Sequence, residues 1–367
     1  MRVTFPRMGH IHLPMRAIME RLGAEVIVPP PITGHTIALG ARHSPEFACF
    51  PLKLNLGNFL EAAALGADTA IMGGGIGPCR FGYYAEVERR ILADLGVDLT
   101  MVVLEPPRGH LKQLLGELKR VAPRHSFRDI WEALHLGLSM FSAIDALEEA
   151  SLMARPVERS RGDTTRALAG ALERLGQATT AKQVRKATLE GLEELRGIER
   201  DVGASPPLRV GLVGEIYMVT EPAANQYLER QLGELGVEVV RGVAVGQWIR
   251  ENIIMDVLRL RRGDRVKQAA KPYLGHPVGG EGLESVGRSV LFAADGLDGV
   301  IQVGPLTCMP EIVAQSILPR VSADTGLPII TLYFDEHSAE AGVATRLEAF
   351  VDLLRQRRRE LLAVGGE

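Results

Sequence analysis

The feature that most constrains the fold of this chain is the alternation of short β-branched runs with segments of helical periodicity. Strands that alternate with helices of this length build parallel sheets that carry helices on their faces. In the first part of the chain we expect, in order, strand Val3–Phe5, helix His12–Leu22, strand Glu25–Val28, helix Leu52–Leu65, strand Thr69–Met72, helix Tyr83–Leu95 and strand Leu99–Leu104.

The middle of the chain has a different character. From about Ile130 to about Arg200, Leu, Ala, Glu and Arg dominate and apolar positions recur at helical spacing, which predicts two or three helices. The clearest boundary is Ser205-Pro206-Pro207. After it we expect strand Leu208–Val213, helix Ala223–Leu235, strand Glu238–Val240, mostly helix over Trp248–Leu274, helix Glu281–Ala294, strand Val300–Val303, helix Pro310–Ala323, strand Ile329–Tyr333 and helix Arg346–Leu361.

These patterns predict an α/β protein with two Rossmann-like parallel-sheet domains and an intervening helical segment. The expected boundaries are 1–125 for the first domain, 126–205 for the helical segment and 206–367 for the second domain. A length of 367 residues suits two or three domains.

Composition excludes several classes of function. The net charge of −3 gives no electrostatic case for nucleic acid or an anionic membrane surface. No stretch has the length of a membrane span, and the first residues lack the layout of a signal peptide, so we expect a cytoplasmic protein. Only three cysteines occur, which favours reduced thiols over a disulfide framework.

Those three cysteines are the strongest candidates for a site. Each lies in a loop bracketed by Gly or Pro and next to an expected helix start. Cys79 and Cys308 also follow the carboxyl end of a strand, which is where open α/β sheets bind ligands. The three loops are residues 47–53 around Cys49, 75–82 around Cys79 and 304–311 around Cys308.

We therefore predict that Cys49, Cys79 and Cys308 share a metal site; the alternative is three unrelated buried cysteines. Thiolates favour zinc or iron–sulfur. No Cys-x-x-Cys pair occurs, so zinc would need a fourth ligand such as His43 or His337. Three dispersed thiolates better suit a cubane that leaves one iron open to substrate.

Other polar residues near the cysteines are secondary candidates. Lys53 and Arg80 could offset the negative charge of a cluster, or form surface salt bridges instead. The glycines before Cys79 do not complete a dinucleotide fingerprint, because Pro78 stands where its last glycine belongs. We interpret them, Gly77 included, as permitting close approach of the backbone to the cluster.

Carboxylates and one histidine follow the strands of the second domain. Glu311 sits in the first turn of a helix, where it could cap the helix or act as a proton donor. His337 is a candidate proton donor or fourth ligand, with an ordinary loop histidine as the alternative. Glu215 and Tyr217 could line the site or form a loop hydrogen-bond network.

Several motifs resemble those of the acyl-CoA dehydratase activase-related proteins, which are relatives of the 2-hydroxyacyl-CoA dehydratase subunits (the D-component of 2-hydroxyglutaryl-CoA dehydratase) and of the double-cubane cluster proteins. In chain order the motifs are Cys-Phe-Pro-Leu-Lys at 49–53, Gly-Pro-Cys-Arg-Phe-Gly-Tyr-Tyr at 77–84, Gly-Glu-Ile-Tyr at 214–217, Gly-Gly-Glu-Gly-Leu-Glu-Ser-Val-Gly at 279–287, Cys-Met-Pro-Glu-Ile-Val-Ala at 308–314, Asp-Glu-His at 335–337 and Thr-Arg-Leu-Glu-Ala-Phe at 345–350.

The resemblance implies two Rossmann-like domains and a [4Fe–4S] cluster at their interface, with the family's ligands falling on Cys49, Cys79 and Cys308. It also implies anaerobic metabolism in which a separate ATP-hydrolysing activator, or another electron donor, delivers an electron for reduction of an acyl-CoA or another small molecule. No Walker motif or actin-like ATPase domain occurs, so we expect the electron to come from a partner.

Two alternatives follow from the same resemblance. A double-cubane-type cluster needs more cysteines than one chain supplies, so it would require a homodimer. The chain could also be a non-catalytic iron–sulfur carrier or electron-transfer subunit that docks on a larger enzyme. In either case we expect a homodimer or a subunit of a complex.

Overall fold

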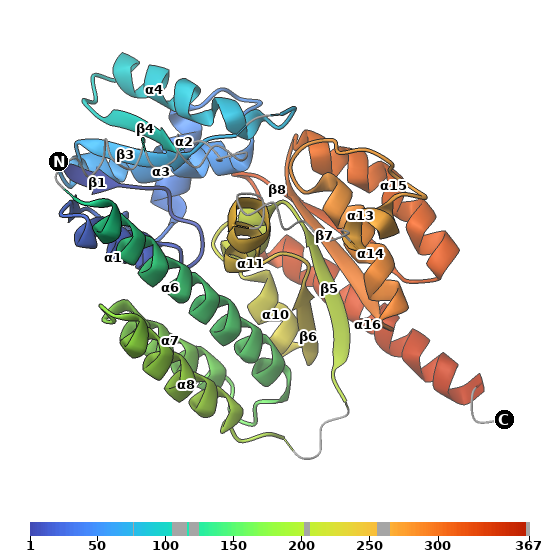
Figure 1. Cartoon of the computed structure of the whole chain (residues 1–367). Helices are drawn as coiled ribbons and strands as arrows, with labels where there is room; N and C mark the ends of the chain where they lie inside the picture. The colour runs from blue at the N-terminus through green and yellow to red at the C-terminus, as the bar shows by residue number, and fades with distance from the viewer. Residues whose placement is uncertain (76, 105–115, 117–124, 202–205, 255–264, 365–367) are drawn as a thin grey trace. The chain divides into compact units, whose positions relative to one another are not determined.

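The computed structural model describes residues 1–75, 77–104, 116, 125–201, 206–254 and 265–364. The chain divides into two units, each built around one sheet (Figure 1). Unit 1 comprises Met1–Ala146, Ala171–Glu190 and Ala244–Arg262, and unit 2 comprises Leu147–Gly170, Gly191–Val243 and Gly263–Glu367.

The sheet of unit 1 has four parallel strands in the order β2-β1-β3-β4. Val3 pairs with both Val26 and Thr69, so β1 lies between β2 and β3. The strands are β1 (Arg2–Thr4), β2 (Glu25–Val26), β3 (Thr69–Gly73) and β4 (Thr100–Leu104), which confirms the four strands expected in this part of the chain.

The sheet of unit 2 repeats this arrangement, in the order β6-β5-β7-β8 and again all parallel. Val210 pairs with Val239 on one side and Gly299 on the other. The strands are β5 (Leu208–Gly214), β6 (Val237–Arg241), β7 (Gly299–Pro305) and β8 (Ile329–Phe334). The prediction of two Rossmann-like parallel sheets is therefore confirmed.

This strand order creates one switch point in each unit. From the first strand the chain moves to a neighbour on one side, then crosses back to the third strand on the other side. The loops after β1 and β3, and those after β5 and β7, therefore leave the same sheet edge in diverging directions. Such points are where open α/β sheets bind ligands.

The helices of unit 1 include one that the hydrophobic pattern does not predict, α2 (Gly34–His43), which begins at a capping box between Thr33 and Thr36. It packs against α3 (Phe50–Ala64) with almost no space between backbones. A Cβ atom on Gly40 would lie 1.7 Å from the Lys53 carbonyl oxygen. The other helices here are α1 (His12–Arg21), the short 3₁₀ helix η1 (Arg80–Tyr83) and α4 (Tyr84–Asp94).

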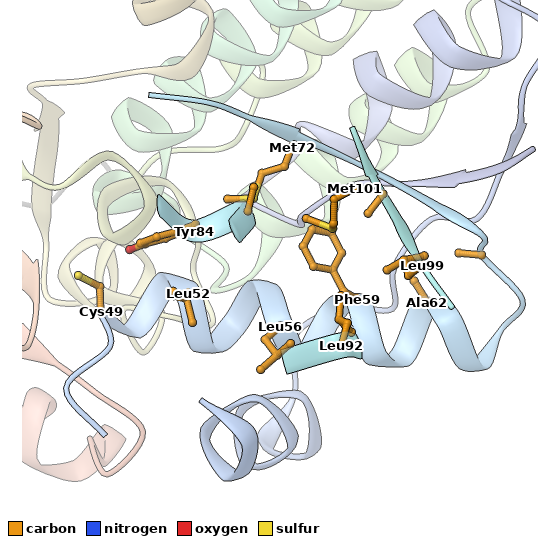
Figure 2. Packing of buried hydrophobic residues seen from close by; sticks show 13 residues of the cluster. Cys49, Leu52, Leu56, Phe59, Ala62, Met72, Tyr84, Leu92, Leu99 and Met101 are labelled. Carbon is orange, nitrogen blue, oxygen red and sulfur yellow. The ribbon is translucent and has the colours of Figure 1, made fainter. Parts of the chain in front are cut away.

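A buried apolar cluster joins α3 to β3, α4 and β4. Figure 2 shows its row of side chains along α3, with Cys49 at the amino-terminal end of the helix followed by Leu52, Leu56 and Phe59. Tyr84, the first residue of α4, belongs to the same cluster as Cys49. The loop of Cys49 is thus anchored to the core of unit 1 and is not a free surface segment.

The helical middle of the chain is present as α6 (Phe127–Ala154), the 3₁₀ turn η2 (Arg155–Val157), α7 (Asp163–Gly176) and α8 (Ala181–Arg196). Packing distributes these helices over both units, since unit 1 includes residues up to Ala146 and unit 2 begins at Leu147. The domain boundaries at 125 and 205 stay predictions. No helix among the described residues is long and apolar enough to span a membrane.

In unit 2, helices cover both faces of the sheet. Gly211 of β5 faces Phe292 of α14, whereas Gly299 of β7 faces Phe350 of α16. The helices of unit 2 are α9 (Ile216–Thr220), α10 (Leu228–Glu234), α13 (Arg265–Ala270), α14 (Gly282–Ala294), α15 (Met309–Thr325) and α16 (Glu340–Val364).

Two expected helices differ from what is observed. The helix α10 starts at Leu228 and not at Ala223, because Gln226 and Tyr227 have φ angles of 57° and 56°, which no α-helix accommodates. The expected helix Trp248–Leu274 is found as α11 (Val245–Ile249), the π-helical turn η3 (Arg250–Ile254) and α13, and residues 255–264 lie outside the described part.

An ion-pair triad ties β6 to two helices of unit 2. The Arg241 guanidinium pairs with Glu148 at the end of α6 and with Glu229 of α10, 2.6 Å separating Nη2 from the Glu229 Oε2 atom. All three side chains are nearly buried. Desolvation opposes the charge of Arg241, but the two carboxylates outweigh it and raise its pKa.

We expect Arg241→Met to lower the free energy of unfolding by about 3 to 5 kcal/mol, because two buried carboxylates lose their cation. Equilibrium urea denaturation measures the change. Arg209→Met is the matched control, because Arg209 on β5 pairs with Glu238 but is 45% exposed. This substitution should lower the free energy of unfolding by less than about 1 kcal/mol. Equal losses in the two variants would contradict the assignment.

Candidate functional site

All three cysteines occupy the same local position, the residue that immediately precedes a helix. Cys49 is the N-cap of α3, Cys79 the N-cap of η1, and Cys308 the N-cap of α15. This confirms the expectation that each lies at a helix start. None of the three side chains makes a capping hydrogen bond. Helix dipoles at such positions stabilise thiolates.

The topology places two of the cysteines equivalently. Cys79 follows β3 and Cys308 follows β7, and each of these strands is the third of its sheet, beside the switch point. Cys49 and Cys79 belong to unit 1 and Cys308 to unit 2. A site shared by all three therefore stays a prediction. Within the described part of the chain, no three His, Cys, Asp or Glu side chains form a complete metal-binding group.

In unit 1 the loops of Cys49 and Cys79 are joined by hydrogen bonds. Arg80, next to Cys79, donates from Nη1 to the Phe47 carbonyl oxygen at 3.0 Å. Lys53 is only 4% exposed and donates from Nζ to the Glu46 carbonyl oxygen at 3.2 Å. Both predicted cations thus contact the segment just before Cys49, so positive charge gathers where two of the thiols lie.

The glycines on either side of Cys79 are required for different structural reasons. Gly77 has a φ of 134°, which side-chain-bearing residues rarely adopt, although a Cβ atom there would meet nothing within 4 Å. At Gly82 the constraint is space, since a Cβ atom would lie 2.3 Å from the Gly75 oxygen. The loop of Cys79 therefore needs glycine for its own shape; approach to a cluster remains a prediction.

The loop of Cys308 contains an unusual backbone conformation. Thr307 has a φ of 69°, in the left-handed region that β-branched residues avoid. Such a residue costs about 1 to 3 kcal/mol, and strain of this kind concentrates at functional sites. The turn is closed by the Cys308 amide, which donates to the Pro305 carbonyl oxygen at 3.0 Å.

Glu311, one turn into α15, is fully buried in a side-chain network. Its carboxyl group accepts hydrogen bonds from Ser285 Oγ at 3.0 Å and from Gln302 Nε2 at 2.7 Å. The Gln302 Oε1 atom in turn accepts from Thr331 Oγ1 at 2.8 Å. The network thus runs from β8 through β7 to α15 and α14. The Glu311 carboxyl group contacts side chains of this network and does not cap α15.

Three further carboxyl groups of unit 2 act on Glu311 or on one another. Burial raises the pKa of Glu311 to about 7, opposed by its hydrogen bonds and reinforced by Glu215 and Glu284. Burial likewise raises the pKa of Glu215 to about 7, and that of Glu281 well above its usual range, where Glu215 and Glu311 add to the effect. Because burial and neighbouring like charge both disfavour ionisation, Glu215, Glu281 and Glu311 hold their protons to higher pH than ordinary glutamates do.

Two neighbours complete this part of unit 2. The Tyr333 hydroxyl is buried without a hydrogen-bond partner among the described residues, and burial raises its pKa, with Glu311 and Cys308 contributing. Tyr333 and Glu311 both pack against Gly304, where a Cβ atom would lie 3.0 Å from Tyr333 Cε1 and 3.2 Å from the Glu311 Cβ atom. His337, by contrast, is exposed on the loop after β8, where its backbone amide donates to Asp335 Oδ1 at 3.0 Å. Its assignment as a catalytic residue stays a prediction.

Sequence reasoning overlooked much of this network. Glu281 and Ser285 lie in a motif that carried the family resemblance but received no role. Gln302 offered a clearer signal, since it is a polar residue in the strand β7, which is buried throughout. A polar side chain in a fully buried strand requires a partner. Here that partner is Glu311.

Comparison with known proteins yields no relative: no protein-family model matches the chain, and no curated protein matches it. The family suggested by the motifs therefore rests on those motifs alone. What the structure adds is the local position of each cysteine and a buried carboxyl group, that of Glu311, three residues after Cys308 in the chain.

We expect Glu311→Gln to flatten the pH dependence of stability. The pKa of Glu311 in the folded state lies above its ordinary value of 4.5. The protonated carboxyl group therefore makes its full contribution to the free energy of unfolding below about pH 4.5, and this contribution is lost as the pH rises through about 7. As the pH rises from about 4.5 to about 8, the free energy of unfolding of Glu311→Gln should increase by up to about 3 kcal/mol relative to that of the unsubstituted protein. Urea denaturation across this range measures it.

The matched control is Glu348→Gln, because Glu348 is exposed on α16. Its unfolding free energy should follow that of the unsubstituted protein at every pH. A profile for Glu311→Gln that also runs parallel to the unsubstituted protein would show that Glu311 titrates normally.

Proposed function

We propose that this chain is an iron–sulfur protein of the 2-hydroxyacyl-CoA dehydratase type, in which Cys49, Cys79 and Cys308 hold a [4Fe–4S] cluster. The observation that carries the proposal is that the only three cysteines all stand at helix N-caps without capping a helix. Chance placement of buried cysteines would scatter them over core faces of strands and helices instead.

The surroundings of the thiols fit an anionic cluster. In unit 1, Arg80 and the buried Lys53 bring two positive charges to the segment before Cys49. In unit 2, Cys308 begins the 17-residue helix α15, whose dipole stabilises negative charge at its start. Hydrogen bonds and charges of this kind tune the potential of a cluster.

When bound, such a cluster supplies one-electron transfer at low potential, and three protein ligands leave one iron for a substrate such as an acyl-CoA or another small molecule. Because the sequence holds no Walker motif, electron delivery would fall to a separate ATP-hydrolysing activator or another electron donor. We also infer a cytoplasmic location.

The group that would donate a proton to the substrate lies in unit 2. Burial raises the pKa of Glu311 to about 7, and Glu215 and Glu281 share its environment. For a substrate reduced at the open iron of the cluster, the proton donor would be Glu311, three residues along the chain from the ligand Cys308. Ser285 and Gln302 hold that group in one orientation through hydrogen bonds of 3.0 and 2.7 Å.

A second candidate function, a carrier that docks on a larger enzyme, is favoured by exposed apolar side chains beside the cysteines. Phe47 and Tyr83 are 73% and 71% exposed in unit 1, close in sequence to Cys49 and Cys79. In unit 2, Leu306 and Ile312 flank Cys308 and are also about half exposed. Exposed apolar groups gathered around a redox centre suit contact with another protein, or with a second copy of this chain.

We expect the anaerobically purified protein to be brown and to contain about four iron and four sulfide per chain. Ser substitution of Cys49, Cys79 or Cys308, one at a time, should abolish or severely reduce iron content, as measured by elemental analysis and absorption. His43→Ala and His337→Ala are the controls, since only a zinc site would need them. Zinc in place of iron, or full iron in all three cysteine variants, would overturn the proposal.

Electron paramagnetic resonance of the reduced protein separates the two candidate functions. If the cluster binds substrate at an open iron, adding acyl-CoA should change the spectrum. In Glu311→Gln, acyl-CoA should still change the spectrum, but the rate at which acyl-CoA is converted should fall. Gln keeps the shape of the network but cannot donate the proton. A spectrum that acyl-CoA leaves untouched would favour the carrier.

A further inference from the structure

One acid of unit 1 is buried without a polar partner. Glu88 of α4 is 0% exposed, and neither of its carboxyl oxygens has a hydrogen-bond partner in the described part of the chain. A neutral carboxyl group offers one O–H donor and several acceptor sites, and buried polar groups in native proteins are almost always bonded. An ionised carboxylate at this position would be still less favourable, because an unpaired charge loses its hydration when it is buried.

Glu88 lies in the middle of the face that α4 presents to the core of unit 1. Tyr84 and Leu92, one helical turn before and after it, both belong to the apolar cluster that joins α3, β3, α4 and β4 (Figure 2). Val87 and Ile91 of α4 pack against the same cluster. The helix therefore holds the Glu88 side chain on the face that contacts apolar groups.

No described residue of the elements that pack against α4 forms an ion pair with Glu88. These elements include η1, α3 and β4, and β4 has no titratable side chain. The titratable side chains of the others and of the cluster are Lys53 and Glu61 of α3, Arg80 and Tyr83 of η1, and Cys49. Lys53 and Arg80 donate to backbone carbonyl oxygens just before Cys49, and Glu61 accepts from Thr36 Oγ1 of α2 at 3.0 Å.

The charged side chains of α4 itself lie on its exposed face. Glu86 forms ion pairs with Arg89 and Arg90, and all three are exposed, as is Asp94. On the buried face, Tyr84 is the other titratable residue of the helix. Burial raises the pKa of Glu88 well above its usual range, and no charge on a described residue contributes to this shift.

We propose that α4 is a pH-sensitive switch, which stays packed on the apolar cluster while Glu88 carries a proton and detaches when Glu88 ionises. Ionisation releases the proton to solvent, and detachment allows water to solvate the carboxylate. Because the pKa of Glu88 in the packed state lies above its ordinary value of 4.5, packing of α4 is most favourable below about pH 4.5. Packing then weakens as the pH rises through the raised pKa.

Detachment of α4 acts on both cysteine loops of unit 1. The helix continues directly from η1, whose N-cap is Cys79. Its first residue, Tyr84, shares the apolar cluster with Cys49, which is 7% exposed. Withdrawal of Tyr84 therefore removes part of the packing that anchors the loop of Cys49. The switch does not depend on the iron–sulfur proposal, because Glu88 is not a proposed ligand and α4 can detach whether or not a cluster is bound.

Hydrogen–deuterium exchange of the full chain between about pH 5 and about pH 9, followed by mass spectrometry, tests the switch. Protection factors are corrected for the intrinsic pH dependence of amide exchange. Those of the α4 amides should fall by up to about tenfold per pH unit above the pKa of Glu88, because opening releases one proton. Those of α8, another helix with residues in unit 1, should stay constant.

Glu88→Gln should make the protection factors of α4 independent of pH, because Gln has a similar shape but cannot ionise. If Glu88→Gln does not fold by circular dichroism, Glu88→Leu, which suits the apolar surroundings, must show the same result. The matched control is Glu86→Gln, which removes a carboxylate from the exposed face of the same helix and should keep the pH dependence of the unsubstituted protein.

Three results would overturn the switch. The first is protection of α4 that does not change with pH in the unsubstituted protein. The second is an equal fall in protection in Glu88→Gln and Glu86→Gln. The third is an equal fall in α8 and α4 of the unsubstituted protein, which would show that unit 1 unfolds as a whole and that α4 does not detach by itself.

Discussion

The pairing of each first strand with the third strand, β1 with β3 and β5 with β7, is the constraint on which the positions of Cys79 and Cys308 depend. Hydrogen bonding between these non-consecutive strands makes their following loops leave one sheet edge. In unit 2 the fit is tight, because Gly214 ends β5 with a φ of 138° and a Cβ atom there would lie 1.8 Å from the Val303 oxygen. That close approach sets Glu215 at the same edge as the loop that leads to Cys308.

The same strand order carries different side chains in the two units. At the switch point of unit 1 the loop after β1 brings Arg7, His10 and His12 together, whereas in unit 2 the residue after β5 is Glu215, which shares its environment with Glu281 and Glu311. In both units a cysteine follows the third strand. The backbone frame therefore provides the place, and the side chains set its chemistry.

How far the sequence predicted this protein depends on the range of the interactions. Strand existence and the helix starts at the cysteines follow from local patterns, and both are found. The helix α2 was missed because it is held by a capping box and by close backbone packing, at Gly40 of α2 and Gly57 of α3, which a hydrophobic pattern does not record. The start of α10 was misplaced because the left-handed residues Gln226 and Tyr227 leave no mark in a hydrophobic pattern.

The sequence by itself determined the fold class and the position of all three cysteines before a helix, because hydrophobic periodicity and Gly/Pro punctuation act over a few residues. Only the tertiary structure decided which polar groups meet. Glu311, Ser285 and Gln302 come from a strand and two helices, and Arg7 meets Asn58 across 51 residues of chain. Burial in these places, which no local pattern records, turns Glu311 from an ordinary surface acid into a proton-retaining one.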